Sequence, residues 1–226
     1  MSQLAQIKKK KKNHGGSFGN FYRGISMKTG RGSKRKVALL QVSIKNIAYL
    51  EDNLSSSEII DLINKVYNKI KVILKEKDAY LYKFTGSNFF IIMDDLENNK
   101  IKLENTFYLS KEILEKLKKH NDFLEQNHIP KIEYSMALDY GNVFIGNVKF
   151  EDNSFPIIIG SPFKITNRII TLNEKKNITP LILTDSIYNE ITDVLSEYII
   201  SVMGLIRIGK KDVYLYGSYQ FNRLST

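Results

Sequence analysis

Residues able to do acid–base or metal chemistry are few in this chain. It has no Cys, which excludes a thiol nucleophile, a disulfide framework and a thiolate metal site. Its three histidines, His14, His120 and His128, show no ligand spacing and form no Ser/His/Asp constellation. Asp94 and Asp95 follow an apolar run, but consecutive strand residues point to opposite faces, so we expect them to cap and turn the chain. The sequence therefore predicts no metal site.

Basic residues gather at the N-terminus. Residues 1–36 contain eleven Lys and Arg and no acidic residue, whereas residues 37–226 carry 23 basic and 24 acidic residues. The segment is rich in Gly and has no helical or strand periodicity, so we expect it to be disordered in isolation. Lys and Arg side chains displace counterions from phosphates, and the aromatic rings between them can stack on bases. This combination favours binding to nucleic acid, a ribonucleoprotein or another acidic surface. An anionic membrane is less favoured because no lipidation motif accompanies the charges, and a solubilising tail is the simplest alternative. The residues expected to contact the polyanion are Lys8, Lys9, Lys10, Lys11, Lys12, Arg23, Arg31, Lys34, Arg35 and Lys36.

Length and composition indicate one folded domain behind this arm. The chain has 226 residues, of which 42% are hydrophobic, and its longest apolar run, residues 89–93, is far shorter than the roughly 20 residues of a membrane span. We expect a cytoplasmic protein without a signal peptide or transmembrane helix. The predicted organisation is an arm over 1–36, a domain over 37–220 and a tail over 221–226.

Hydrophobic periodicity predicts the elements of the domain. Strands are expected at 36–45, 79–84, 88–93 and 180–183, and helices at 59–74 behind a serine cap, from about 105 to 120 or beyond, and at 161–172. Two strands are expected around Asp139, which would form their turn, and Asp185 would cap a helix reaching residue 191. A hairpin closes the chain around residues 209–211. This order predicts an α+β fold with a ferredoxin-like or polymerase-palm core, a sheet with helices on one face.

Four segments in a fixed order make this prediction more specific. They are LQVSIKNIA at 40–48, KFTGS at 83–87, ALDYGNVFIGNV at 137–148 and IIIGSPFKITNR at 157–168. Their order and glycines resemble the catalytic domain of class III nucleotidyl cyclases, the adenylate and guanylate cyclases, over about residues 37–218. The resemblance implies a cyclase-like α+β fold that pairs head to tail with a second domain.

The positions that the resemblance makes functional carry unexpected residues. The family uses two Asp to hold two divalent cations, and both positions are serines here, Ser43 and Ser87. The purine-reading Asp is replaced by Ile157, and the ribose-orienting Asn by Lys164. The nucleotide-binding cations that remain, as vestiges of that site, are Lys83, Arg168 and either Lys210 or Lys211.

Two interpretations follow, because heterodimeric cyclases also have a half with Ser in place of the metal-binding Asp. We favour a pseudo-cyclase, which has no catalytic residues, needs no cofactor and serves as an interaction or regulatory module delivered by its basic arm. The alternative is an accessory subunit whose partner chain supplies both Asp, and Mg²⁺ or Mn²⁺ would then bind only in that pair. A weaker alternative is a sensor that binds a nucleotide without chemistry. Each predicts a dimer, homotypic or with a related cyclase-domain chain.

Overall fold

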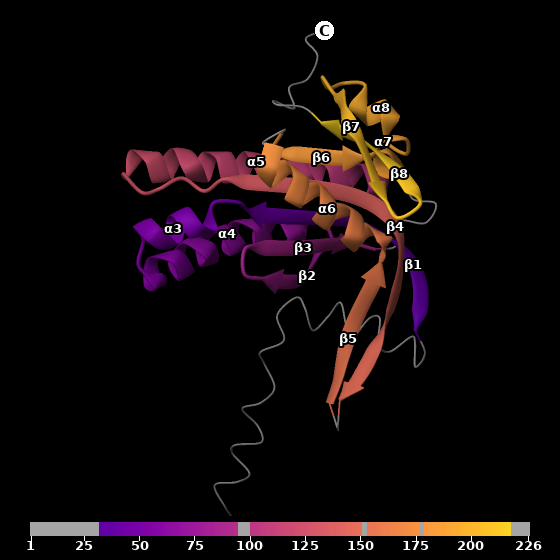
Figure 1. Cartoon of the computed structure of the whole chain (residues 1–226), viewed down its shortest axis with the longest axis horizontal. Coiled ribbons are helices and arrows are strands. Elements are labelled where there is room, and N and C mark those ends of the chain that lie inside the picture. Colours follow the sequence, from indigo (N-terminus) through magenta and orange to yellow (C-terminus); the bar gives the residue numbers. More distant parts are fainter. Residues whose placement is uncertain (1–31, 95–99, 151–152, 177–178, 218–226) are drawn as a thin grey trace, which may run out of the picture.

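The computed structural model describes residues 32–94, 100–150, 153–176 and 179–217 (Figure 1). Within them, eight strands form one sheet in the order β2-β3-β1-β4-β6-β8-β7, and β5 pairs with β4 outside this path. The strands are β1 (Ser33–Ile44), β2 (Tyr80–Thr85), β3 (Asn88–Met93), β4 (Tyr134–Phe150), β5 (Asn153–Gly160), β6 (Leu181–Thr184), β7 (Ser201–Ile208) and β8 (Lys211–Gly217). The helices are α3 (Ile47–Asn53), α4 (Ser56–Glu76), α5 (Lys100–Gln126), α6 (Ser161–Lys176), α7 (Asp185–Tyr188) and α8 (Thr192–Leu195).

The first half of the domain is the predicted βαββαβ core. β1 lies between β3 and β4 and pairs antiparallel with both. The chain then crosses to β6, which runs parallel to β4, and ends in the β7–β8 hairpin. The prediction of an α+β fold with this core is therefore confirmed.

Helices cover both faces of the sheet, which differs from the expectation of one covered face. On one face α4 and α5 bury side chains such as Val66 and Phe107 against Val42 of β1. On the other face α6 buries Ile165 and Ile169 against β4 and β6 (Figure 1). Successive strand residues point to opposite faces, so a strand that is apolar throughout, as β1 is from Val37 to Leu40, requires cover on both sides.

The serine cap predicted for α4 is present. Ser55 accepts a hydrogen bond from the Glu58 amide, and the Glu58 carboxylate accepts one from the Ser55 amide at 2.8 Å. Such a capping box satisfies two amides that the first helical turn leaves unpaired, which explains why the helix begins at this point.

The segment around Asp139 was predicted wrongly. β4 is one continuous strand of 17 residues, and Asp139 lies in its interior, 1% exposed, rather than in a turn. The chain reverses only after Phe150, and β5 returns along the same strand with Val143 opposite Gly160. The two strands form a long ribbon that projects beyond the body of the molecule (Figure 1).

Other boundaries also differ from the sequence-based expectations. The strand expected from residue 36 begins at Ser33, so Lys34, Arg35 and Lys36 belong to β1 rather than to an arm. The helix expected to reach residue 191 ends at Tyr188, and its N-cap position is occupied by Thr184. The rest of the predicted arm and the predicted tail lie outside the described residues.

Candidate functional site

Ser43 and Ser87, the two serines that the resemblance places at metal-binding positions, lie together at one end of β1. The Ile44 amide donates to the Ser87 carbonyl at 2.9 Å, so the β2–β3 turn is held against the end of β1. Ser43 is only 1% exposed, and its hydroxyl donates to Glu174 Oε1 on α6 at 3.2 Å. The Ser87 hydroxyl accepts a hydrogen bond from the Asn88 side chain at 3.2 Å.

This donor set does not fit a pair of divalent cations. Mg²⁺ and Mn²⁺ prefer carboxylate oxygens, and here two neutral hydroxyls accompany the single carboxylate of Glu174. Ser43 is also buried, and its hydroxyl already donates a hydrogen bond to Glu174. No cluster of three His, Cys, Asp or Glu that could hold a metal ion occurs among the residues that the structure describes.

Buried polar contacts between α6 and the sheet were not visible in the sequence. Gln41, 1% exposed on β1, donates from one amide nitrogen to Asn88 at 3.0 Å and to Asn167 at 2.9 Å. Asn173, further along α6, donates to the Ser135 hydroxyl of β4 at 2.7 Å. Together with the bond from Ser43, these contacts hold α6 across β1 and β4. In the sequence, Gln41 is one polar residue in an apolar strand. Such a residue can indicate a buried hydrogen bond, but the sequence does not show which residue the bond is made with.

The residues predicted to be vestiges of a nucleotide-binding site lie on several elements. Lys164 and Arg168 are one turn apart on α6 and share a face of that helix, both exposed, while Lys83 is exposed on β2. Ile157 is half-buried on β5. Lys210 lies in the β7–β8 turn, and Lys211 opens β8. The structure therefore groups Lys164 with Arg168 and places Lys211 in a separate pocket.

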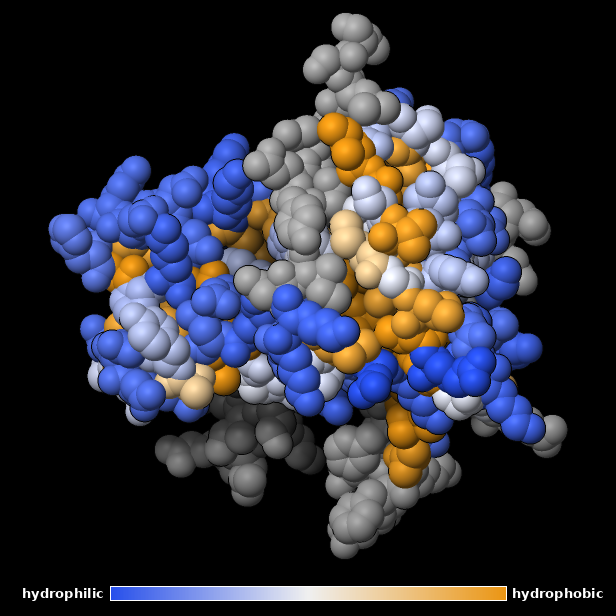
Figure 2. Space-filling view, turned by 45° about the horizontal axis from the view of Figure 1, so that its top comes forward, coloured by the Kyte–Doolittle hydropathy of each residue, from blue (hydrophilic) through white to orange (hydrophobic). Residues whose placement is uncertain are grey.

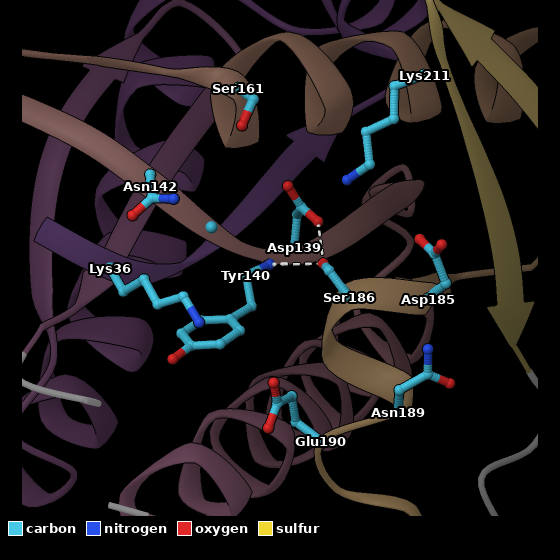
Figure 3. Close-up of a pocket in the computed structure, with 11 residues that line it drawn as sticks. Lys36, Asp139, Tyr140, Asn142, Ser161, Asp185, Ser186, Asn189, Glu190 and Lys211 are labelled. Atoms are coloured by element: carbon cyan, nitrogen blue, oxygen red, sulfur yellow. Dashed lines mark hydrogen bonds between the residues drawn. The ribbon is translucent and has the colours of Figure 1, made fainter. Parts of the chain in front are cut away.

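That pocket, of about 340 Å³, lies between β4, α7 and the start of β8 (Figure 3). At its centre the Asp139 carboxylate accepts hydrogen bonds from the hydroxyls of Thr184 and Ser186, both at 2.6 Å. Burial raises the pKa of Asp139, an effect that these hydroxyls and the charge of Lys211 partly oppose. Lys36 lies over the Tyr140 ring, 5.0 Å from its centroid. The remaining lining includes Asp185 and Glu190, so the pocket is polar and mixed in charge.

Two of the described basic residues of the predicted arm, Arg35 and Lys36, have partners within the domain. Arg35 forms an ion pair with Asp94 at 2.8 Å, and Asp94 is 8% exposed. Asp94, which was expected to cap a turn, neutralises this arginine, and Asp95 lies outside the described residues. Lys36 lies in the pocket with Asp139, and Lys34 is exposed on β1. Lys8–Lys12, Arg23 and Arg31 lie outside the described residues.

Comparison with known proteins agrees with this fold. The family model described as "Adenylate and Guanylate cyclase catalytic domain" matches residues 31–211. The chain belongs to the adenylate and guanylate cyclase catalytic domain family. No curated protein sequence matches it.

Solved cyclase structures are similar in fold over most of the chain. The adenylyl cyclase CyaB from P. aeruginosa has a TM-score of 0.71 at 18% identity, covering 82% of this chain and 94% of its own. The guanylyl cyclase Cya2 has a TM-score of 0.67 at 14% identity, with 82% and 92% covered. The non-canonical dimeric guanylyl cyclase domain of the RhoGC fusion protein from Blastocladiella emersonii has a TM-score of 0.64 at 16% identity, with 82% and 97% covered. At these identities the likeness concerns the fold.

No helix in the described part of the chain is long and apolar enough to cross a membrane.

Proposed function

We propose that this chain is a pseudo-cyclase, a nucleotidyl-cyclase domain that has lost catalysis and works as an interaction and regulatory module. Ser43 carries this proposal. A cyclase needs carboxylates at this position and at that of Ser87 to hold the cations that activate the ribose hydroxyl. Here the first position is a buried hydroxyl that donates to Glu174, and the second is a neutral hydroxyl in a turn.

A Mn²⁺ titration tests this proposal, with the free ion followed by electron paramagnetic resonance. We expect no saturable binding by the full chain that depends on either serine. The double variant S43D/S87D restores both carboxylates and serves as the matched positive control, for which we expect a gain in Mn²⁺ affinity. Saturable binding by the unmodified chain that is lost in S43A would contradict the proposal.

The β4–β5 ribbon supports a role in interaction. Phe144 is 61% exposed and lies directly opposite Ile159, which is 57% exposed. On the same face Gly146 lies opposite Ile157, and Val148 is 50% exposed two residues further along β4. Figure 2 shows apolar surface at the base of this ribbon.

The replacement of the purine-reading Asp by Ile157 has two effects. It removes the carboxylate that would accept hydrogen bonds from a purine edge, and it joins the exposed apolar residues on either side into one stripe. Such a stripe fits a second cyclase-fold domain of similar chemistry, in a homodimer or with a related chain. In this proposal the arm at residues 1–36 contacts nucleic acid or another polyanion independently of the ribbon.

An accessory subunit is the second candidate function, and the exposure of two basic side chains favours it. Lys83 and Arg168 are exposed, and the described part of the chain supplies neither side chain with a hydrogen bond or an ion pair. Both side chains are therefore available to a nucleotide bound at a partner's carboxylates. The test mixes the full chain with a cyclase chain that carries both Asp. Cyclic nucleotide formation by the mixture, absent from either chain alone and lost with R168A, would establish this function over the first.

A further inference from the structure

A groove runs between α4 and α5, on the face of the sheet opposite α6, to which Ser43 bonds. Its lining residues are Lys65, Asn68, Lys69, Val72 and Lys116, which we call the lysine groove, and its volume is about 420 Å³. The two helices lie antiparallel here, since Lys77 after the end of α4 pairs with Glu112 of α5, one turn before Lys116. Residues one turn apart on a helix share a face, so Lys65 and Lys69 form one wall and Lys116 the other.

The charged residues that line this groove are all lysines, and the described residues do not form ion pairs with them. Residues 62–75 of α4 contain four Lys and no acidic residue, and residues 116–121 of α5 contain three Lys and none. The described part of the chain gives Lys65, Lys69 and Lys116 no ion pair. By contrast, the nearest acidic residues of α5 are engaged, Glu115 with Lys111 and Glu112 with Lys77. Cations held together without counter-charges favour an anionic ligand.

An exposed aromatic ring extends the α5 wall of the groove. Lys116, His120 and Phe123 follow at four- and three-residue spacing, so they share a face of α5. Phe123 is 50% exposed, and its ring stacks with that of His120 at a centroid distance of 6.3 Å and an interplanar angle of 11°. His120 is 3% exposed, and its Nε2 has no hydrogen-bond partner among the described residues. Half of the Phe123 side chain is therefore open to a ligand, beside a buried ring that lies nearly parallel to it.

We propose that the lysine groove, extended by Phe123, binds single-stranded nucleic acid. Proteins that hold single strands combine a cationic groove for phosphates with aromatic side chains on which bases stack, and this surface offers both. A duplex would satisfy the lysines but leave the ring without an unpaired base to stack on. The site belongs to the folded domain, so it stands whether or not the chain is catalytically degenerate and does not depend on the arm at residues 1–36.

The test measures the affinity of the full chain for a fluorescent oligouridine by anisotropy over a series of NaCl concentrations. The variant K65Q/K69Q removes two cations from one wall of the groove. The matched control K175Q/K176Q removes two exposed cations from the end of α6, which covers the other face of the sheet, so both variants have the same net charge. Each phosphate neutralised on a single strand contributes about −0.7 to the log–log salt slope. We expect K65Q/K69Q to reduce the slope by about 1.4, and the control to leave it unchanged.

Two further measurements separate nucleic acid from other anionic partners. F123L is expected to weaken oligouridine binding by about 5- to 150-fold, the range of one lost base–aromatic stack, without changing the salt slope. Equal effects of the two double variants, or none from K65Q/K69Q, would overturn the proposal, because binding would then depend on net charge or on the arm alone. It would also be overturned if K65Q/K69Q released the chain from vesicles containing phosphatidylserine but left oligouridine binding intact.

Discussion

Replacing Phe144 by Ser should dissociate the proposed dimer without unfolding the protomer. Full burial of a Phe side chain contributes about 1.5–3 kcal/mol. Phe144 is 61% exposed in the protomer, so an interface could still bury about three-fifths of it, or about 1–2 kcal/mol. A two-fold dimer contains this contact twice, which gives about 2–4 kcal/mol and weakens the dimer roughly 30- to 900-fold.

Sedimentation equilibrium over a range of protein concentrations measures this change, and circular dichroism checks that F144S keeps its fold. The matched control is I101S, because Ile101 is 74% exposed on α5 rather than on the ribbon. We expect I101S to dimerise as the unmodified chain does. An unmodified chain that is monomeric at tens of micromolar, or equal dissociation in both variants, would refute the role given to the ribbon.

Three further substitutions test the packing that positions these surfaces. Burial raises the pKa of Asp139, so the native protein binds this proton more tightly than the unfolded chain and loses stability as pH rises through the native pKa. The urea midpoint of D139N should therefore rise relative to that of the unmodified chain as pH increases from 4 to 8, and a constant difference between the two midpoints would contradict this. G160A should destabilise the domain by more than ~1 kcal/mol in urea unfolding, because a Cβ there would lie 2.5 Å from the Asn142 carbonyl oxygen, and an unchanged midpoint would show that β5 can move away. R35Q should cost about 1–3 kcal/mol in the same assay by leaving the nearly buried Asp94 without its cation, whereas R35Q/D94N should recover part of that loss.

Local patterns in the sequence predicted the core well. The apolar stripe of α4 and its serine cap fixed a helix that the structure reproduces, because both signals are contained within the helix itself. The run at 88–93, which is nearly all apolar, indicated a buried strand and became β3, between β2 and β1. The order of these elements was enough to predict the βαββαβ arrangement.

Contacts between distant segments limited what the sequence could predict. Asp139, two residues before Gly141, resembled a turn residue, but the structure buries Asp139 against hydroxyls that lie 45 and 47 residues later. The hydrogen bond between Ser43 and Glu174 spans 131 residues. The sequence therefore showed a serine at a position where a carboxylate was expected, but it did not show that Glu174 would bind this serine. The lysine groove needs two helices side by side, and in the sequence each contributes only an ordinary basic face.

Cyclic nucleotide formation by the purified full chain tests the proposed loss of catalysis most directly. The assay supplies ATP or GTP with Mn²⁺, at a protein concentration where the chain is dimeric. With neutral hydroxyls at Ser43 and Ser87 in both protomers, neither site of a homodimer has the carboxylates for a cation pair, and we predict no product above the protein-free blank. Sustained turnover by the unmodified chain that S43A abolishes would contradict the account.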